Sequence, residues 1–131
     1  MKPFPAVVLA TTLSFAAAPG PARAGDYYPE LITLIAELAN LDALAKRCEE
    51  DMNNYGKDAL QKEMCANFTG HYAELWPDHD ALSNQILDFA QRAERGEIAC
   101  DDNCRSMLRR CEELRISIRY VFDYIDYVKT Q

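Results

Sequence analysis

The last third of the chain carries the clearest alternation of apolar and polar positions. Its apolar residues recur at alternating spacings of four and three, which is typical of one buried face of an α-helix. These residues are Cys100, Cys104, Met107, Cys111, Leu114, Ile118, Val121, Ile125 and Val128. Asp101 and Asp102 stand at the start of the series, where carboxylates favour the free amides of a helix N-terminus. The pattern predicts a long helix over 100–128.

Three shorter segments upstream show the same helical periodicity. Leucines and small residues at spacings of three and four predict a first helix over about 28–50, with Pro29 at its first turn and a turn at 52–56. A second helix is predicted over 57–76 and ended by Pro77, whose ring disfavours helical geometry just before it. Its apolar stripe comprises Leu60, Met64, Phe68, His71 or Tyr72, and Leu75.

The third predicted helix follows Pro77 and is capped by Asp78 or Asp80. Gly96 is expected to end it in the left-handed conformation. Its inward face comprises Leu82, Ile86, Phe89 and Ala93. No stretch alternates as a β-strand would. The chain is therefore predicted to be all-α, as a four-helix up-down-up-down bundle stapled by disulfides at one end. A looser all-α arrangement is the alternative, because the long helix outruns the third.

The N-terminal residues have the composition of a signal peptide. Met1 and Lys2 precede an apolar stretch over 7–18, which is too short to span a bilayer, and 22–24 read Ala-Arg-Ala. We expect 1–24 to be a signal peptide cleaved before Gly25, and 25–131 to form a single helical domain. The mature protein is expected in the periplasm or secreted, with no membrane association.

The negative net charge of the chain bears on which classes of partner it can bind. Removal of Lys2 and Arg23 leaves 12 basic residues against 21 acidic ones. A surface so negative repels phosphate backbones and anionic lipids, so the sequence predicts no binding to nucleic acid or membranes. All five cysteines follow the predicted cleavage site. In an oxidising compartment they are expected to form disulfides and to leave one thiol unpaired.

The predicted topology suggests how the cysteines pair. Cys48 would lie at the end of the first helix, next to the start of the last helix, within reach of Cys100 or Cys104. Cys65 and Cys111 would lie at similar heights on the second and fourth helices, although these helices are diagonal in an ideal bundle and a disulfide needs ~4.4–6.8 Å between Cα atoms.

The leucine series Leu34-x3-Leu38-x2-Leu41-x2-Leu44-x3-Cys48, followed by Cys100 and Arg109-Arg110, resembles a family of small uncharacterised exported α-helical proteins of alphaproteobacteria. The resemblance covers the first and last helices only. That family is marked by two well-separated cysteines thought to form a bridge, and the resemblance places this bridge at Cys48 and Cys100. Cys65, Cys104 and Cys111 depart from its pattern. We therefore expect Cys48–Cys100, with Cys104 as the alternative partner.

Few residue groups favour catalysis or metal binding. The sequence contains no phosphate-binding glycine loop, nucleophile elbow or metalloprotease motif, so we expect no enzymatic activity. His71 and His79 lie among acidic residues, but helix capping and core hydrogen bonding explain them as well as a metal does. No metal or other cofactor is predicted.

Aromatic residues gather near the end of the last helix. Tyr120, Tyr124 and Tyr127 form a stripe beside the apolar seam, and Trp76 is expected at the same end of the bundle. These residues could be ordinary core, or they could form a contact surface, because Tyr and Trp are enriched in protein interfaces. The resulting hypothesis is an accessory, inhibitor, immunity or chaperone-like protein that binds another protein or a second copy of itself. The alternative is a small metal-binding or redox protein that uses its cysteine-rich end.

Overall fold

The computed structural model describes residues 24–131, and within this range the chain is all-α with no β-strand. Its elements are α2 (Ala24–Tyr55), the short 3₁₀ helix η2 (Gly56–Gln61), α3 (Glu63–Leu75), α4 (His79–Glu94) and α5 (Asp102–Lys129). The predicted fold class and the four helices are confirmed. The predicted signal peptide falls on residues outside the described range, except that Ala24 begins α2.

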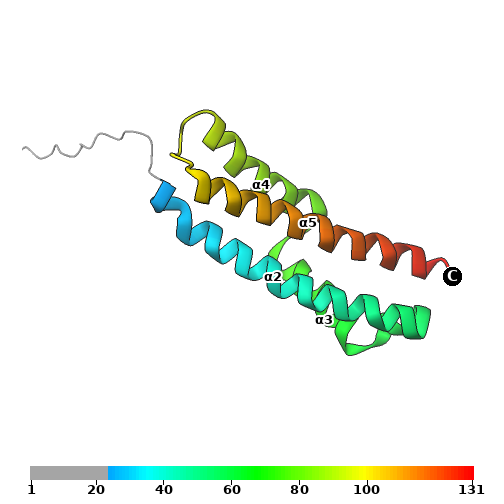
Figure 1. Ribbon diagram of the computed structural model, residues 1–131. Coiled ribbons are helices and arrows are strands. Elements are labelled where there is room, and N and C mark those ends of the chain that lie inside the picture. The colour runs from blue at the N-terminus through cyan, green and yellow to red at the C-terminus, as the bar shows by residue number, and fades with distance from the viewer. Residues whose placement is uncertain (1–23) are drawn as a thin grey trace, which may run out of the picture.

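The two longest helices, α2 and α5, lie side by side and run in the same direction (Figure 1). Ser117 on α5 donates a hydrogen bond to Asp42 (2.7 Å) and accepts one from Lys46 (2.7 Å) on α2. Further along both helices, the Tyr124 hydroxyl donates to Asn53 (2.6 Å). Residue numbers rise together from one contact to the next, as they must in a parallel pair.

The two shorter helices, α3 and α4, follow one another in the opposite direction (Figure 1). The chain reverses at Gly56 (φ 61°) and again at Gly96 (φ 74°), where both glycines adopt the left-handed conformation. Between α3 and α4 it does not reverse, because Trp76 and Asp78 are both extended and carry the chain onward past Pro77. The direction of α4 therefore differs from the predicted up-down-up-down order: two long parallel helices are covered by one row made of two short helices.

The predicted helix faces are largely the buried ones. On α5 the buried residues are Cys104, Cys111, Leu114, Ile118, Val121, Ile125 and Val128. Gly96 and the cap at Asp78, which accepts a hydrogen bond from the Ala81 amide (2.9 Å), also match the prediction. α2 extends beyond both predicted ends, from Ala24 to Tyr55.

The predicted second helix is interrupted. Lys62 is extended and separates η2 from α3, and its amide donates to the Ala59 carbonyl. This break shifts the buried face by one residue relative to part of the predicted stripe. The buried residues of this segment are Ala59, Cys65, Phe68, Tyr72 and Trp76.

The disulfides join cysteines other than the expected pairs. Cys48 bonds to Cys65, and Cys100 bonds to Cys104, while Cys111 is free and buried. The expected Cys48–Cys100 and Cys65–Cys111 bridges are therefore wrong.

The parallel arrangement of α2 and α5 explains this result. It places Cys48 beside the region of Val121, about 25 Å along α5 from Cys104 at 1.5 Å per residue. Because α2 continues to Tyr55, Cys48 lies about 10 Å before its end, level with Cys65 on the antiparallel α3. The one free thiol matches the prediction from the odd number of cysteines.

Candidate functional site

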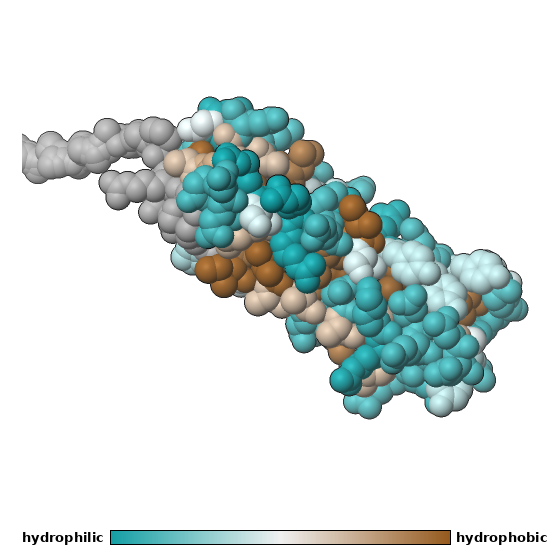
Figure 2. Space-filling model, viewed as in Figure 1, coloured by the Kyte–Doolittle hydropathy of each residue, from teal (hydrophilic) through white to brown (hydrophobic). Residues whose placement is uncertain are grey.

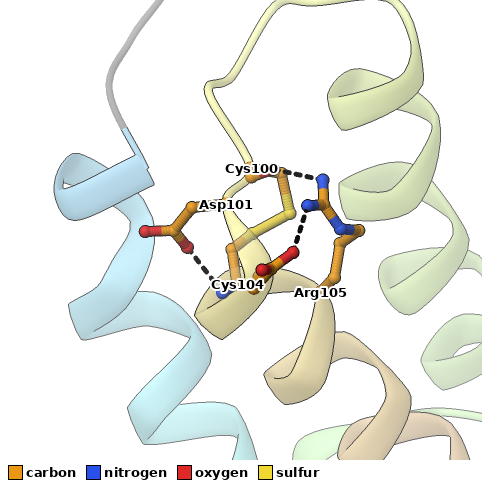
Figure 3. Close-up of polar contacts among 5 residues, drawn as sticks. Cys100, Asp101, Cys104 and Arg105 are labelled. Atoms are coloured by element: carbon orange, nitrogen blue, oxygen red, sulfur yellow. Dashed lines mark hydrogen bonds and ion pairs between the residues drawn. A yellow bond between two sulfur atoms is a disulfide. The ribbon is translucent and has the colours of Figure 1, made fainter.

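The Cys100–Cys104 disulfide lies at the N-terminus of α5 (Figure 3). Cys100 precedes the helix and is half-buried, whereas Cys104 lies in the first turn and is fully buried. Asp101 caps the helix by accepting a hydrogen bond from the Cys104 amide (2.8 Å). The two cysteines therefore differ in accessibility, and Cys100 is the more exposed residue of the pair.

Arg105 fastens the residues around this disulfide. Its guanidinium donates to the carbonyl oxygen of Cys100 (2.7 Å) and to the carboxylate of Asp102 (2.5 Å) (Figure 3). The first contact satisfies a carbonyl that lies outside the helix. The Cys100 backbone is thus held against the first turn of α5 by a charged hydrogen bond as well as by the disulfide.

A cavity of about 360 Å³ opens beside the disulfide, between α4 and α5. Cys100 is part of its wall. The other lining residues are Ala90, Ala93 and Leu108, which are apolar, and Glu94, Arg105 and Arg109, which are charged. A second cavity of about 420 Å³ shares Ala90, Leu108 and Arg109 with it and continues past Leu87. Together they form a groove along α4 and α5, hereafter the α4–α5 groove.

The charge of this groove differs from that of the whole chain, whose net charge is −7. Arg105 and Arg109 both line the end next to Cys100, where Glu94 is the one acidic lining residue. Among residues 24–131, no carboxylate forms an ion pair with Arg109, whereas Arg105 pairs with Asp102. Glu112 lines the other end of the groove, so the groove has an apolar wall, two arginines and two glutamates, and Arg109 is its cationic group near Cys100 that pairs with no carboxylate of the described chain.

Cys111 lies further along the same helix and belongs to the core. It is fully buried, and burial raises the pKa of its thiol to about 11. A thiol with so high a pKa is almost entirely protonated near neutral pH, and the protonated form is a poor nucleophile. The Cys111 thiol is therefore poorly reactive near neutral pH.

The predicted tyrosine surface lies at the opposite end of α5. Tyr120 and Tyr127 are exposed, at 59% and 60% of their area, and Tyr124 is half-buried between α5 and Asn53 of α2. The rings of Tyr124 and Tyr127 stack with centroids 6.3 Å apart. Figure 2 shows pale side chains gathered toward this end of the molecule, while strongly apolar ones gather toward the other half. The structure thus brings the three tyrosines together on one face.

Trp76 does not belong to this surface. It is only 5% exposed, packs against the Tyr72 ring at 5.2 Å, and donates from its indole nitrogen to Gln85 (2.8 Å). Its expected place in an exposed patch is therefore wrong. The reason is the Trp76–Asp78 connection, which turns the indole into the junction between α3 and α4.

The two histidines are far from forming one site. His71 faces a polar cavity between α2 and α3 and lies 3.6 Å from the carboxylate of Glu74. His79 packs edge-on against Phe122, with ring centroids 4.4 Å apart. No group of three or more His, Cys, Asp or Glu side chains within residues 24–131 is arranged to hold a metal ion.

Sequence reasoning identified the cysteine-rich end but missed the α4–α5 groove. The short spacing of Cys100 and Cys104 around the capping residue Asp101 could have indicated a local disulfide at the start of the helix. The groove carried no such signal, because Ala90, Ala93 and Leu108 become a wall only when α4 lies antiparallel against α5.

No protein-family model, no curated protein and no solved structure matches this chain. None of the helices within residues 24–131 has the length and apolar character needed to cross a membrane.

Proposed function

We propose that this protein is exported to the periplasm or secreted, and that it binds another protein through its tyrosine face, which takes no part in catalysis. This face consists of Tyr120, Tyr124 and Tyr127. The observation that carries the proposal is the exposure of two large aromatic side chains on a rigid helix, next to a third that is anchored by a hydrogen bond. Tyrosine supplies broad contact area at low entropic cost, which favours its use in interfaces.

The rigidity of the face supports the same proposal. Tyr124 is fixed by Asn53, and the neighbouring core positions Val121, Ile125 and Val128 are buried. A partner that covers the face would therefore pay little for ordering it. The two disulfides support export, because such bonds persist in oxidising compartments.

Site-specific photocrosslinking in the producing cell tests this proposal. A benzophenone amino acid placed at Tyr127 should give a discrete crosslinked product, either with another protein or with a second copy of this chain. Ile32 is the matched control position, because it is also exposed (58%), lies on α2 and lines neither cavity of the α4–α5 groove. Equal crosslinking at both positions, or none at Tyr127, would contradict the proposal.

A pair of variants then tests the residues themselves. Tyr120→Ser combined with Tyr127→Ser should abolish the crosslink from a probe at Lys129 while leaving helicity unchanged, because both side chains are exposed. Tyr124 is kept, since its hydroxyl contributes to the contact between α2 and α5. Sedimentation at increasing concentration shows whether the partner is a second copy.

A further inference from the structure

We propose that the Cys100–Cys104 disulfide is redox-active and exchanges with the thiols of a cysteine-containing peptide segment seated in the α4–α5 groove. The two disulfides of the protein differ in the property that decides exchange, which is access to sulfur. Cys48 and Cys65 are both buried, whereas Cys100 is half-buried and forms part of the cavity wall. An incoming thiolate can therefore reach one sulfur atom of one disulfide.

Access decides which cysteine is attacked and which one leaves. Cys104 is fully buried in the first turn of α5, whereas Cys100 is half-buried and lies in the cavity wall. The incoming thiolate therefore bonds to Cys100, and Cys104 is the leaving group.

The reaction is a balanced two-electron exchange. A substrate thiolate attacks Sγ of Cys100, the bond between Cys100 and Cys104 breaks, and Cys104 leaves as a thiolate that takes up a proton. The product is a mixed disulfide between the substrate and Cys100. A second substrate thiolate then attacks the substrate sulfur and releases Cys100. The substrate dithiol is oxidised to a disulfide, the protein disulfide is reduced to a dithiol, and the two substrate protons end on Cys100 and Cys104.

The groove indicates the class of substrate. Its wall of Ala90, Ala93 and Leu108 suits an apolar side chain beside the reacting cysteine. Arg109, which pairs with no carboxylate among residues 24–131, suits an acidic side chain. The expected substrate is therefore a peptide or unfolded chain with an acidic residue near its cysteine. This inference is independent of the tyrosine face, which lies at the other end of α5.

Redox titration of the purified, fully oxidised protein is the first test. The protein is equilibrated with graded ratios of reduced and oxidised glutathione, quenched by alkylation and mapped by mass spectrometry. Cys100 and Cys104 should become alkylated at ratios at which Cys48 and Cys65 remain bonded. Reduction of both disulfides together, or of Cys48–Cys65 first, would overturn the proposal.

Trapping a mixed disulfide is the second test. In Cys104→Ser the free Cys100 thiol should capture an acidic cysteine peptide supplied with an activated disulfide, about tenfold faster than the matched variant Cys100→Ser, whose remaining thiol is buried. Equal rates would overturn the proposal. Circular dichroism checks that each variant is folded, and the titration of the unaltered protein decides the question if either is not.

The role of the arginine is tested with the same trap. Arg109→Gln should slow capture of the acidic peptide several-fold but leave capture of a neutral peptide unchanged. Arg119→Gln, on the same helix but outside the groove, is the control and should change neither rate. Equal slowing with both peptides would show that Arg109 does not select an acidic substrate.

Discussion

The two halves of this bundle are covered in different ways, although the same two long helices run through both. In the half covered by α3, aromatic rings close the core. The ring centroid of Phe122 lies 4.7 Å from that of Phe68 and 4.8 Å from that of Tyr72, both on α3. It lies 4.4 Å from that of His79, the first residue of α4. In the half covered by α4, small residues such as Ala90 and Ala93 face α5 and leave the α4–α5 groove open. The contrast concerns the side facing α5: rings fill it beside α3, whereas the α4–α5 groove stays open, and the cavity of the α3 half lies instead between α2 and α3 near His71.

The two disulfides also differ between the α3 half and the α4 half, in burial and in the length of chain that each one closes. Cys48–Cys65 is buried and joins two helices across 17 residues, so it restricts the unfolded chain substantially. Cys100–Cys104 spans only 4 residues within one local segment and has a half-buried sulfur. A short loop contributes least to stability by the chain-entropy estimate. We therefore expect the α3 half to contribute more to stability, whereas the α4 half holds the more accessible disulfide.

The largest expected effect is loss of a ring from the closed half. Phe68 is fully buried against Phe122, so Phe68→Ala should lower the free energy of unfolding by about 3–5 kcal/mol through lost burial and a cavity. Urea denaturation under oxidising conditions measures this change. Leu87→Ala, at an exposed position of α4, is the control and should change stability by less than about 0.5 kcal/mol. A small change in the free energy of unfolding for Phe68→Ala would contradict the view that aromatic packing stabilises the α3 half.

Removing each disulfide sharpens the comparison. The double variant Cys48→Ala and Cys65→Ala should lose about 3 kcal/mol, and Cys100→Ala with Cys104→Ala about 2 kcal/mol or less, from the respective loop lengths. Thermal and urea unfolding of the two double variants provide the values. A larger loss from Cys100–Cys104 would mean that this bridge is mainly structural.

The buried thiol predicts a dependence on alkaline pH. Burial raises the pKa of Cys111 to about 11 from an ordinary value near 9, so the folded state holds its proton after the unfolded state has lost it. This contribution to stability is fully present below about pH 9 and is lost as pH rises through 11, a difference of about 2–3 kcal/mol. Urea unfolding between pH 8 and pH 11 measures the decline, which should be shallower in Cys111→Ala. Identical declines in stability for the unaltered protein and Cys111→Ala would contradict a contribution from the Cys111 thiol.

The two aspartate caps offer the smallest expected effects. Asp78→Ala at the start of α4 and Asp101→Ala at the start of α5 should each cost about 1 kcal/mol, because each removes an acceptor for a free helix amide. Asp101→Ala should also alter the reduction of Cys100–Cys104, since Asp101 accepts from the Cys104 amide, whereas Asp78→Ala should not. Thermal unfolding and the glutathione titration separate the two effects.

The sequence by itself determined that the chain is helical and which faces of α2, α4 and α5 are buried, but not the interruption at Lys62 or the buried face around it. The four-and-three spacing of α5 survives in the structure from Cys104 to Val128, because side chains on one helix face must enter the same core whatever covers them. Gly56 and Gly96 likewise predicted turns, and the chain reverses its direction at both, where the backbone conformation favours glycine. These features depend on local geometry, which the residues specify directly.

The tertiary structure alone decided the direction of α4, and with it the disulfides and the groove. An amphipathic pattern reads the same whether a helix points up or down, so Pro77 marked an interruption without indicating whether the chain turns back. In the structure Trp76 and Asp78 have extended backbones, so the chain does not turn back and α4 continues in the direction of α3. That choice made α2 and α5 parallel, moved Cys48 away from Cys100, buried Trp76 and placed the small residues of α4 beside the Cys100 sulfur.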